Sequence, residues 1–98
     1  MSEGKITTIF LMWDVRYVED GEEKFRIEQD FMWSYLQDFV RTNDITSVTF
    51  YAKGLTERIG NTSYEARIHE EVLTKEEFLE VNDGWLDERK KQLGILPS

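Results

Sequence analysis

The stretch ITTIFLMWDVRYV, residues 6–18, consists mostly of β-branched and aromatic residues, which favour an extended backbone. Its hydrophobic residues recur at every second position, and side chains with that spacing share one face of a strand. These positions are Ile9, Leu11, Trp13, Val15 and Tyr17. The stretch therefore predicts a long strand with one face in the core.

The opposite face of this strand is also partly hydrophobic, because Phe10 and Met12 lie between those positions. A strand that is apolar on both sides needs cover on both sides. If two helices flank the sheet, a helix such as the C-terminal one covers this second face. The alternative is a partner protein or a second copy of the chain, since aromatic residues and methionine are enriched at interface cores.

After this strand, Glu19-Asp20-Gly21 is typical of a turn, and Phe25 and Ile27 resume the alternation in a second strand. A two-residue Asp20-Gly21 loop would place Phe25 and Ile27 opposite charged residues of the first strand. We therefore expect a three-residue loop in which Gly21 is left-handed and forms a bulge. The expected cross-strand pairs are Phe25 with Val15 and Ile27 with Trp13.

A helix is expected from about Phe31 to Thr42, with Asp30 as its N-cap. Met32 and Trp33 widen its apolar arc to roughly 200°, which is more than one sheet face needs. The hydrophobic residues at helical spacing are Phe31, Tyr35, Leu36, Phe39 and Val40. The helix is therefore expected to pack on the sheet, with part of its apolar surface outside that contact.

Trp33 is a candidate interface residue, because it lies at the edge of this arc beside Gln37 and Arg41. Trp85 shares the helical phase of Phe78 and is expected in the core. The predicted partner-binding residues are Phe10, Met12, Trp33, Gln37 and Arg41.

Two further strands are expected after a break at Asn43-Asp44. The third strand runs from Ile45 to about Leu55, and Gly54 is expected to mark a bulge. Its core-facing residues are Val48, Phe50 and Ala52. After a turn around Gly60-Asn61, strict alternation predicts a fourth, half-buried strand. In that strand Tyr64, Ala66 and Ile68 alternate with Glu65, Arg67 and His69.

The C-terminal helix begins with a capping box formed by Thr74 and Glu77. Its hydrophobic residues keep one helical phase across Asn82-Asp83-Gly84, which predicts a helix that continues, with or without a kink, to Gly94. The resulting order is ββαββα. We predict a single α+β domain over residues 1–98, in which two helices pack on an antiparallel four-stranded sheet.

The composition fits one folded domain, because hydrophobic residues make up 40% of the 98 residues. The absence of cysteine excludes disulfides and thiolate metal sites and favours a reducing, cytoplasmic location. The N-terminus lacks a basic segment followed by a long apolar stretch, so neither a signal peptide nor a membrane span is expected. The formal charge of −8 disfavours direct binding to nucleic acid or anionic membranes and favours a basic protein partner.

The sequence contains no nucleophile motif, phosphate loop, dinucleotide fingerprint or zinc spacing. Its one histidine, His69, is expected on the polar face of its strand beside Arg67 and Glu71, and only His69 and Glu71 are placed to converge. The carboxylates nearest to one another in the hairpin, expected to be solvated, are Asp14, Glu28 and Asp30. We therefore predict no catalytic residue, no metal site and no cofactor.

These patterns favour binding over catalysis. The leading hypothesis is a small acidic module that docks on a larger, basic protein and inhibits it, with a nucleic-acid-binding surface as the target. Being short, acidic and rich in aromatic residues, the chain resembles small phage-encoded inhibitors of bacterial enzymes or defence systems. One alternative is a homo-oligomer that binds a small ligand in an aromatic-lined pocket containing Phe10 and Met12. Another is a small enzyme that uses His69 with carboxylates.

Overall fold

The computed structural model describes residues 5–58 and 62–94. Its strands are β1 (Lys5–Glu19), β2 (Glu22–Gln29), β3 (Asp44–Arg58) and β4 (Thr62–Leu73). Its helices are the 3-10 turn η1 (Asp30–Met32), α1 (Trp33–Thr42), α2 (Lys75–Leu79) and α3 (Asp83–Gln92). The strands form one antiparallel sheet in the order β2-β1-β3-β4. The predicted α+β class and ββαββα order are confirmed.

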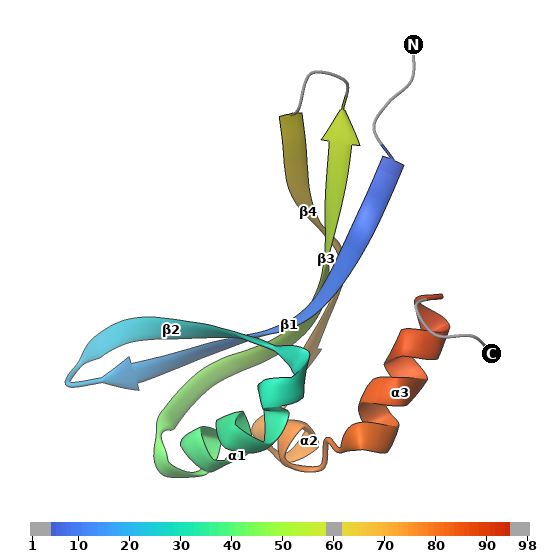
Figure 1. Cartoon of the computed structure of the whole chain (residues 1–98). Coiled ribbons are helices and arrows are strands. Elements are labelled where there is room, and N and C mark those ends of the chain that lie inside the picture. The colour runs from blue at the N-terminus through green and yellow to red at the C-terminus, as the bar shows by residue number, and fades with distance from the viewer. Residues whose placement is uncertain (1–4, 59–61, 95–98) are drawn as a thin grey trace.

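The sheet is bent, and all of the helices lie on its convex side (Figure 1). β2 forms one arm with parts of β1 and β3, and α1 and α2 lie beneath this arm. β4 forms the other arm with the remaining parts of β1 and β3, and α3 lies beside it. Of the two alternatives for the second face of β1, cover by a helix that flanks the sheet is therefore wrong for the described helices. The opposite side of the sheet, which we call the concave face, carries no helix of the described residues.

The core lies between the sheet and the helices and is centred on Trp13, which is fully buried. The rings of Phe50, Phe78 and Trp85 lie 5.0, 4.8 and 5.8 Å from the Trp13 ring, centroid to centroid. The indole Nε1 of Trp13 donates a hydrogen bond of 3.2 Å to the backbone oxygen of Asp30. Trp13 of β1 therefore packs in one aromatic cluster with residues of β3, α2 and α3. The prediction that Trp85 belongs to the core is confirmed.

The first helix differs from its prediction at the N-terminus. Asp30 does not cap it, because a 3-10 turn comes first and its N-cap position, Gln29, makes no side-chain cap hydrogen bond. A 3-10 turn has three residues per turn, so it rotates Phe31 out of the phase of α1. Phe31 is consequently 64% exposed. Tyr35, which lies within α1 but outside its buried face, is 66% exposed. The face of α1 that is buried carries Leu36, Gln37 and Val40.

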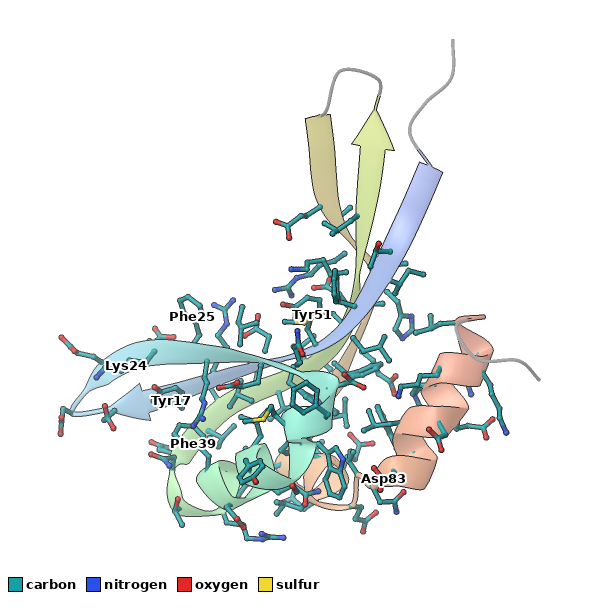
Figure 2. All side chains as sticks on the ribbon, viewed as in Figure 1. Tyr17, Lys24, Phe25, Phe39, Tyr51 and Asp83 are labelled. Carbon is teal, nitrogen blue, oxygen red and sulfur yellow. The ribbon has the colours of Figure 1, made fainter. Side chains whose placement is uncertain are left out.

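The β1–β2 hairpin has a two-residue loop, and the predicted three-residue loop is wrong. Asp20 and Gly21 have φ angles of 54° and 78°, and two left-handed residues match the twist of the flanking strands. Phe25 is paired with Arg16 and Ile27 with Asp14. The prediction failed because it assumed that Phe25 and Ile27 face the core, whereas both point to the concave face, where Figure 2 labels Phe25.

The C-terminal segment contains two helices, and the predicted continuous helix is wrong. The capping box of α2 is present: the Glu77 backbone N–H donates to Thr74 Oγ1 at 3.0 Å, and the Thr74 N–H donates to Glu77 Oε1 at 2.8 Å. The helix ends at Leu79, and Asn82 caps α3 by accepting a hydrogen bond of 2.9 Å from the Trp85 N–H. An asparagine at an N-cap competes with helix continuation.

A bulge in β4 changes which residues share a face. Ala52 is paired with His69, whereas Lys53 is paired with Arg67, so Ile68 is the extra residue. His69 therefore lies on the helix side and Arg67 on the concave face, and the prediction that they share a face is wrong. The expectation of a half-buried strand also fails at Ala66 and Ile68, which are exposed; the side chain of Tyr64 lies outside the described residues.

The prediction that Gly54 marks a bulge is wrong, because Gly54 is paired with Ile9 of β1 and with Ala66 of β4. The turn predicted around Gly60-Asn61 lies outside the described residues. Glu71, on the helix side of β4, accepts two hydrogen bonds of 2.8 Å from Arg89 of α3. The Arg89 guanidinium also lies 4.1 Å from the centroid of the Trp85 ring. These contacts fasten α3 to the sheet.

Candidate binding surface

The concave face contains an open hollow of about 340 Å³ where the two arms of the sheet meet. Residues from all four strands line it: Met12, Ile27, Tyr51, Lys53, Glu65, Ala66 and Arg67. Figure 2 shows Phe25 and Tyr51 on this side of the ribbon and Phe39 on the other. The hollow exists because the bend of the sheet brings β2 and β4, its two edge strands, to face each other across β1 and β3.

An ion network lies in the middle of the concave face, around Asp14, which is only 3% exposed. Arg16 donates to both carboxylate oxygens of Asp14, from Nε at 2.9 Å and from Nη2 at 3.1 Å. Arg67 reaches the same carboxylate from β4, with Nη2 3.1 Å from Oδ2. Its Nη1 donates to Glu70 at 2.7 Å. The network therefore joins β1 to β4, two strands that are not neighbours in the sheet.

The cations of this face also stack on aromatic rings. The guanidinium carbon of Arg67 lies 3.8 Å from the centroid of the Tyr51 ring, and that of Arg16 lies 5.2 Å from the Phe25 ring. Lys53 Nζ lies 5.6 Å from the Phe10 ring and 2.9 Å from Glu65 Oε1. Each of these cations is thus paired with a carboxylate, so the middle of the face is close to neutral while the chain as a whole carries −8.

Large hydrophobic side chains remain exposed around this network. Phe25 is 61% exposed, and Ile27 beside it on β2 is 39% exposed. Val72 of β4 is 71% exposed and is paired with Thr49 on the same face. Phe25 and Ile27 are neighbours on this face of β2, and exposed apolar side chains that lie together mark interaction surfaces more often than scattered single ones. The concave face is therefore our candidate site.

The five predicted partner-binding residues lie on opposite sides of the molecule. Phe10 and Met12 lie on the concave face, and both are partly exposed. Trp33, Gln37 and Arg41 lie on α1, on the helix side. The two groups do not form one surface.

Within the α1 group, Arg41 is the exposed residue, and its side chain pairs with Asp38 at 2.8 Å. Trp33 is partly buried against the core. Gln37 is buried, and its Nε2 donates two hydrogen bonds of 2.9 Å, to the backbone oxygens of Phe78 and Val81. The amide of Gln37 therefore joins α1 to α2 and to the residues that follow α2. The proposed interface does not include Gln37.

Sequence reasoning did not select Phe25, Ile27, Tyr51 and Arg67 as site residues. A signal for the first two was present: an Asp-Gly pair strongly favours a two-residue hairpin loop, and that loop puts both residues opposite charged partners. The alternation placed Arg67 on the polar face of its strand, but no local signal identified its contact with Asp14, which lies 53 residues away in the chain.

Protonation of Asp14 is expected to destabilise the fold. Burial raises the pKa of Asp14, but hydrogen bonds and charges from Arg16 and Arg67 outweigh burial, so the pKa lies below its ordinary value. A carboxyl whose pKa is lowered in the folded state stabilises that state above the unfolded pKa, and this contribution is lost as the pH falls through the folded pKa. Asp14→Asn is therefore expected to lower the free energy of unfolding by about 1–2 kcal/mol at pH 7.

Urea denaturation at several pH values checks this prediction. The difference between wild type and Asp14→Asn is expected to shrink below about pH 4, where free aspartate titrates. Asp38→Asn is the matched control, because Asp38 forms an exposed pair with Arg41 and is expected to change stability little at any pH. A difference for Asp14→Asn that stays constant from pH 7 to pH 2.5 would contradict the role assigned to its charge.

The titratable groups that the sequence singled out lie mostly in separate pairs among the described residues. His69 Nε2 is enclosed and lies 3.6 Å from Glu71 Oε1, so these two residues converge as predicted. The three hairpin carboxylates separate: Asp14 binds Arg16, Glu28 pairs with Arg26 at 2.7 Å, and Asp30 lies 3.6 Å from Lys90. Within residues 5–58 and 62–94, no three His, Cys, Asp or Glu side chains are grouped to hold a metal ion.

In the part of the chain that the structure describes, no helix has the length and apolar character needed to cross a bilayer. Comparison of the chain with protein-family models, with curated proteins and with solved structures finds no match.

Proposed function

We propose that this protein is a protein-binding module that docks through its concave face on a partner with an apolar centre and a basic periphery. The observation that carries the proposal is the exposure of Phe25, Ile27 and Val72 on a sheet face that no described helix covers. Burying such side chains on a partner is favourable at about 25 cal/mol per Å² of apolar area. The module acts by binding and carries out no catalytic step.

The charge distribution supports a basic partner. The cations in the middle of the concave face are paired, so this region offers hydrophobic contact without attracting an anion. At the tip of the β1–β2 hairpin, Lys24 pairs with Glu19, and Asp20, Glu22 and Glu23 are exposed acidic residues beside this pair. Together with the net charge of −8, this acidic tip attracts a positively charged surface and speeds its encounter with the module.

A basic surface of this kind is found on proteins that bind nucleic acid. The proposal therefore includes inhibition: the module occupies the nucleic-acid-binding surface of a larger protein, in the cytoplasm. The cysteine-free sequence supports that compartment.

A matched pair of variants tests the docking surface. Phe25→Ala removes an exposed ring from the concave face, and Tyr35→Ala removes a comparably exposed ring from α1 on the opposite side. We expect Phe25→Ala to weaken partner capture about tenfold, as the loss of an interface anchor does, and Tyr35→Ala to leave capture unchanged. Capture from lysate of the source cell, quantified at two salt concentrations, is the measurement.

The result that supports the proposal is capture of a basic protein that depends on Phe25 and weakens with salt. Capture that both variants retain equally would place the interface elsewhere. Sedimentation of the purified chain supplies a further check: a stable dimer that Phe25→Ala dissociates would show that the concave face takes a second copy of the chain, and the proposed basic partner would be wrong.

A second candidate function is a homo-oligomer that binds a small ligand, and the hollow that Met12 helps to line favours it. Its volume of about 340 Å³ lies at the lower end of the range for small-molecule sites, roughly 300–1,000 Å³. A thermal-shift screen with metabolites and nucleotides discriminates the two functions, because a ligand that binds only the folded state raises the melting temperature.

A further inference from the structure

We infer that the hollow of the concave face receives a single flat, uncharged ring, supplied by an aromatic side chain of the partner. The inference rests on the proposed docking function and adds the chemistry of the anchor to it. It follows from the way in which Arg67 is held.

The guanidinium of Arg67 is planar, and much of its surface is already occupied. Along its edge, Nη1 and Nη2 donate to Glu70 and Asp14 at 2.7 and 3.1 Å. One of its faces lies 3.8 Å from the ring centroid of Tyr51. The side chain nevertheless remains 35% exposed and lines the hollow. The part of the Arg67 guanidinium that remains for a partner is therefore largely its second face. A guanidinium face stacks on aromatic rings.

The other walls of the hollow favour the same group. Met12 supplies a thioether, which makes favourable contacts with aromatic rings, and Ile27 supplies an apolar side chain on the opposite rim. Lys53 and Glu65 line the hollow as an ion pair with Nζ and Oε1 2.9 Å apart, so neither charge calls for an ionic ligand. A volume of about 340 Å³ leaves room for one aromatic side chain.

The test uses N-acetyl-tryptophanamide as the probe and needs no identified partner. Carbon-detected methyl NMR of the full chain follows the Met12 and Ile27 methyl signals during titration. We expect weak, saturable shifts of both signals, and affinity at least fivefold lower for N-acetyl-leucinamide, whose side chain cannot stack. Shifts that do not saturate, or equal affinity for the two probes, overturn the inference.

Arg67→Lys and Arg16→Lys form a matched pair, because both arginines bind the Asp14 carboxylate but only Arg67 lines the hollow. We expect Arg67→Lys to weaken N-acetyl-tryptophanamide binding about fivefold, since lysine has no planar face to stack, and Arg16→Lys to leave it unchanged. Melting curves confirm that both variants are folded at the titration temperature. Equal binding by the two variants would also overturn the inference.

The outcomes separate this inference from the docking proposal. If the probe binds as expected but no protein capture depends on Phe25, docking fails and the hollow is a site for a free aromatic molecule. If capture depends on Phe25 but the probe does not bind, the docking proposal stands, and the inference that the hollow receives an aromatic ring is wrong.

Discussion

Trp13→Ala is expected to destabilise the protein by about 3–5 kcal/mol, the range for removing a large, fully buried aromatic side chain. Trp13 contacts rings from β3, α2 and α3, so its loss leaves a cavity that no single element can fill by moving. The substitution also leaves the Asp30 backbone oxygen without its indole donor. Small domains have a total stability of about 5–15 kcal/mol, so this loss removes a large share of the total at the lower end of that range and would leave such a domain largely unfolded near 37 °C.

Urea denaturation followed by tryptophan fluorescence and far-ultraviolet circular dichroism measures this loss. Phe31→Ala is the control, because Phe31 is also aromatic but is largely exposed on η1, and its loss is expected to change stability by less than about 0.5 kcal/mol. Comparable destabilisation by both variants would mean that the Trp13 cluster is not the centre of the core.

Gln37→Met is expected to cost about 1–3 kcal/mol, although methionine is similar in size and apolar. The Gln37 amide donates to the backbone oxygens of Phe78 and Val81 in a buried setting. The Phe78 oxygen keeps the Val81 N–H as a donor at 3.1 Å, whereas the Val81 oxygen loses its donor, and a buried acceptor left without a donor costs about 1–3 kcal/mol. These oxygens lie where the chain leaves α2 and approaches α3, so the loss is expected to loosen that connection first.

Hydrogen exchange resolved by residue measures this effect, with Arg41→Ala as the control. Arg41 lies one turn further along α1 and pairs with the exposed Asp38, so its loss is expected to leave exchange unchanged. Partner capture by Gln37→Met, measured below its melting temperature, is expected to equal that of wild type. A variant that keeps full stability but loses capture would restore Gln37 to the interface.

The two sides of the sheet therefore have different tasks. The helix side supplies stability through Trp13, Gln37 and the Glu71–Arg89 pair. The concave face presents exposed hydrophobic residues around a set of paired ions. The hydrophobic residues on both sides of β1 reflect this division: Leu11 and Trp13 fill the core, and Phe10 and Met12 form part of the proposed interface.

The sequence by itself determined the elements whose signals are local. The alternation in residues 6–18 specifies β1 because side chains in a strand change face at each residue. The Thr74–Glu77 capping box specifies the start of α2 because both of its hydrogen bonds lie within four residues. The class and the order of elements followed from such signals, and so did the core positions of Val48, Phe50 and Ala52.

Only the tertiary structure decided the faces and the site, because these depend on residues far apart in the chain. The alternation of Phe25 and Ile27 fits both possible hairpin registers. Which face of β2 is exposed to solvent depends on the side of the sheet on which the helices pack. Gln37 joins α1 to α2 through the carbonyl of Phe78, 41 residues away in the chain. Arg67 reaches Asp14 across 53 residues, and the bulge at Ile68 places Arg67 and His69 on opposite faces.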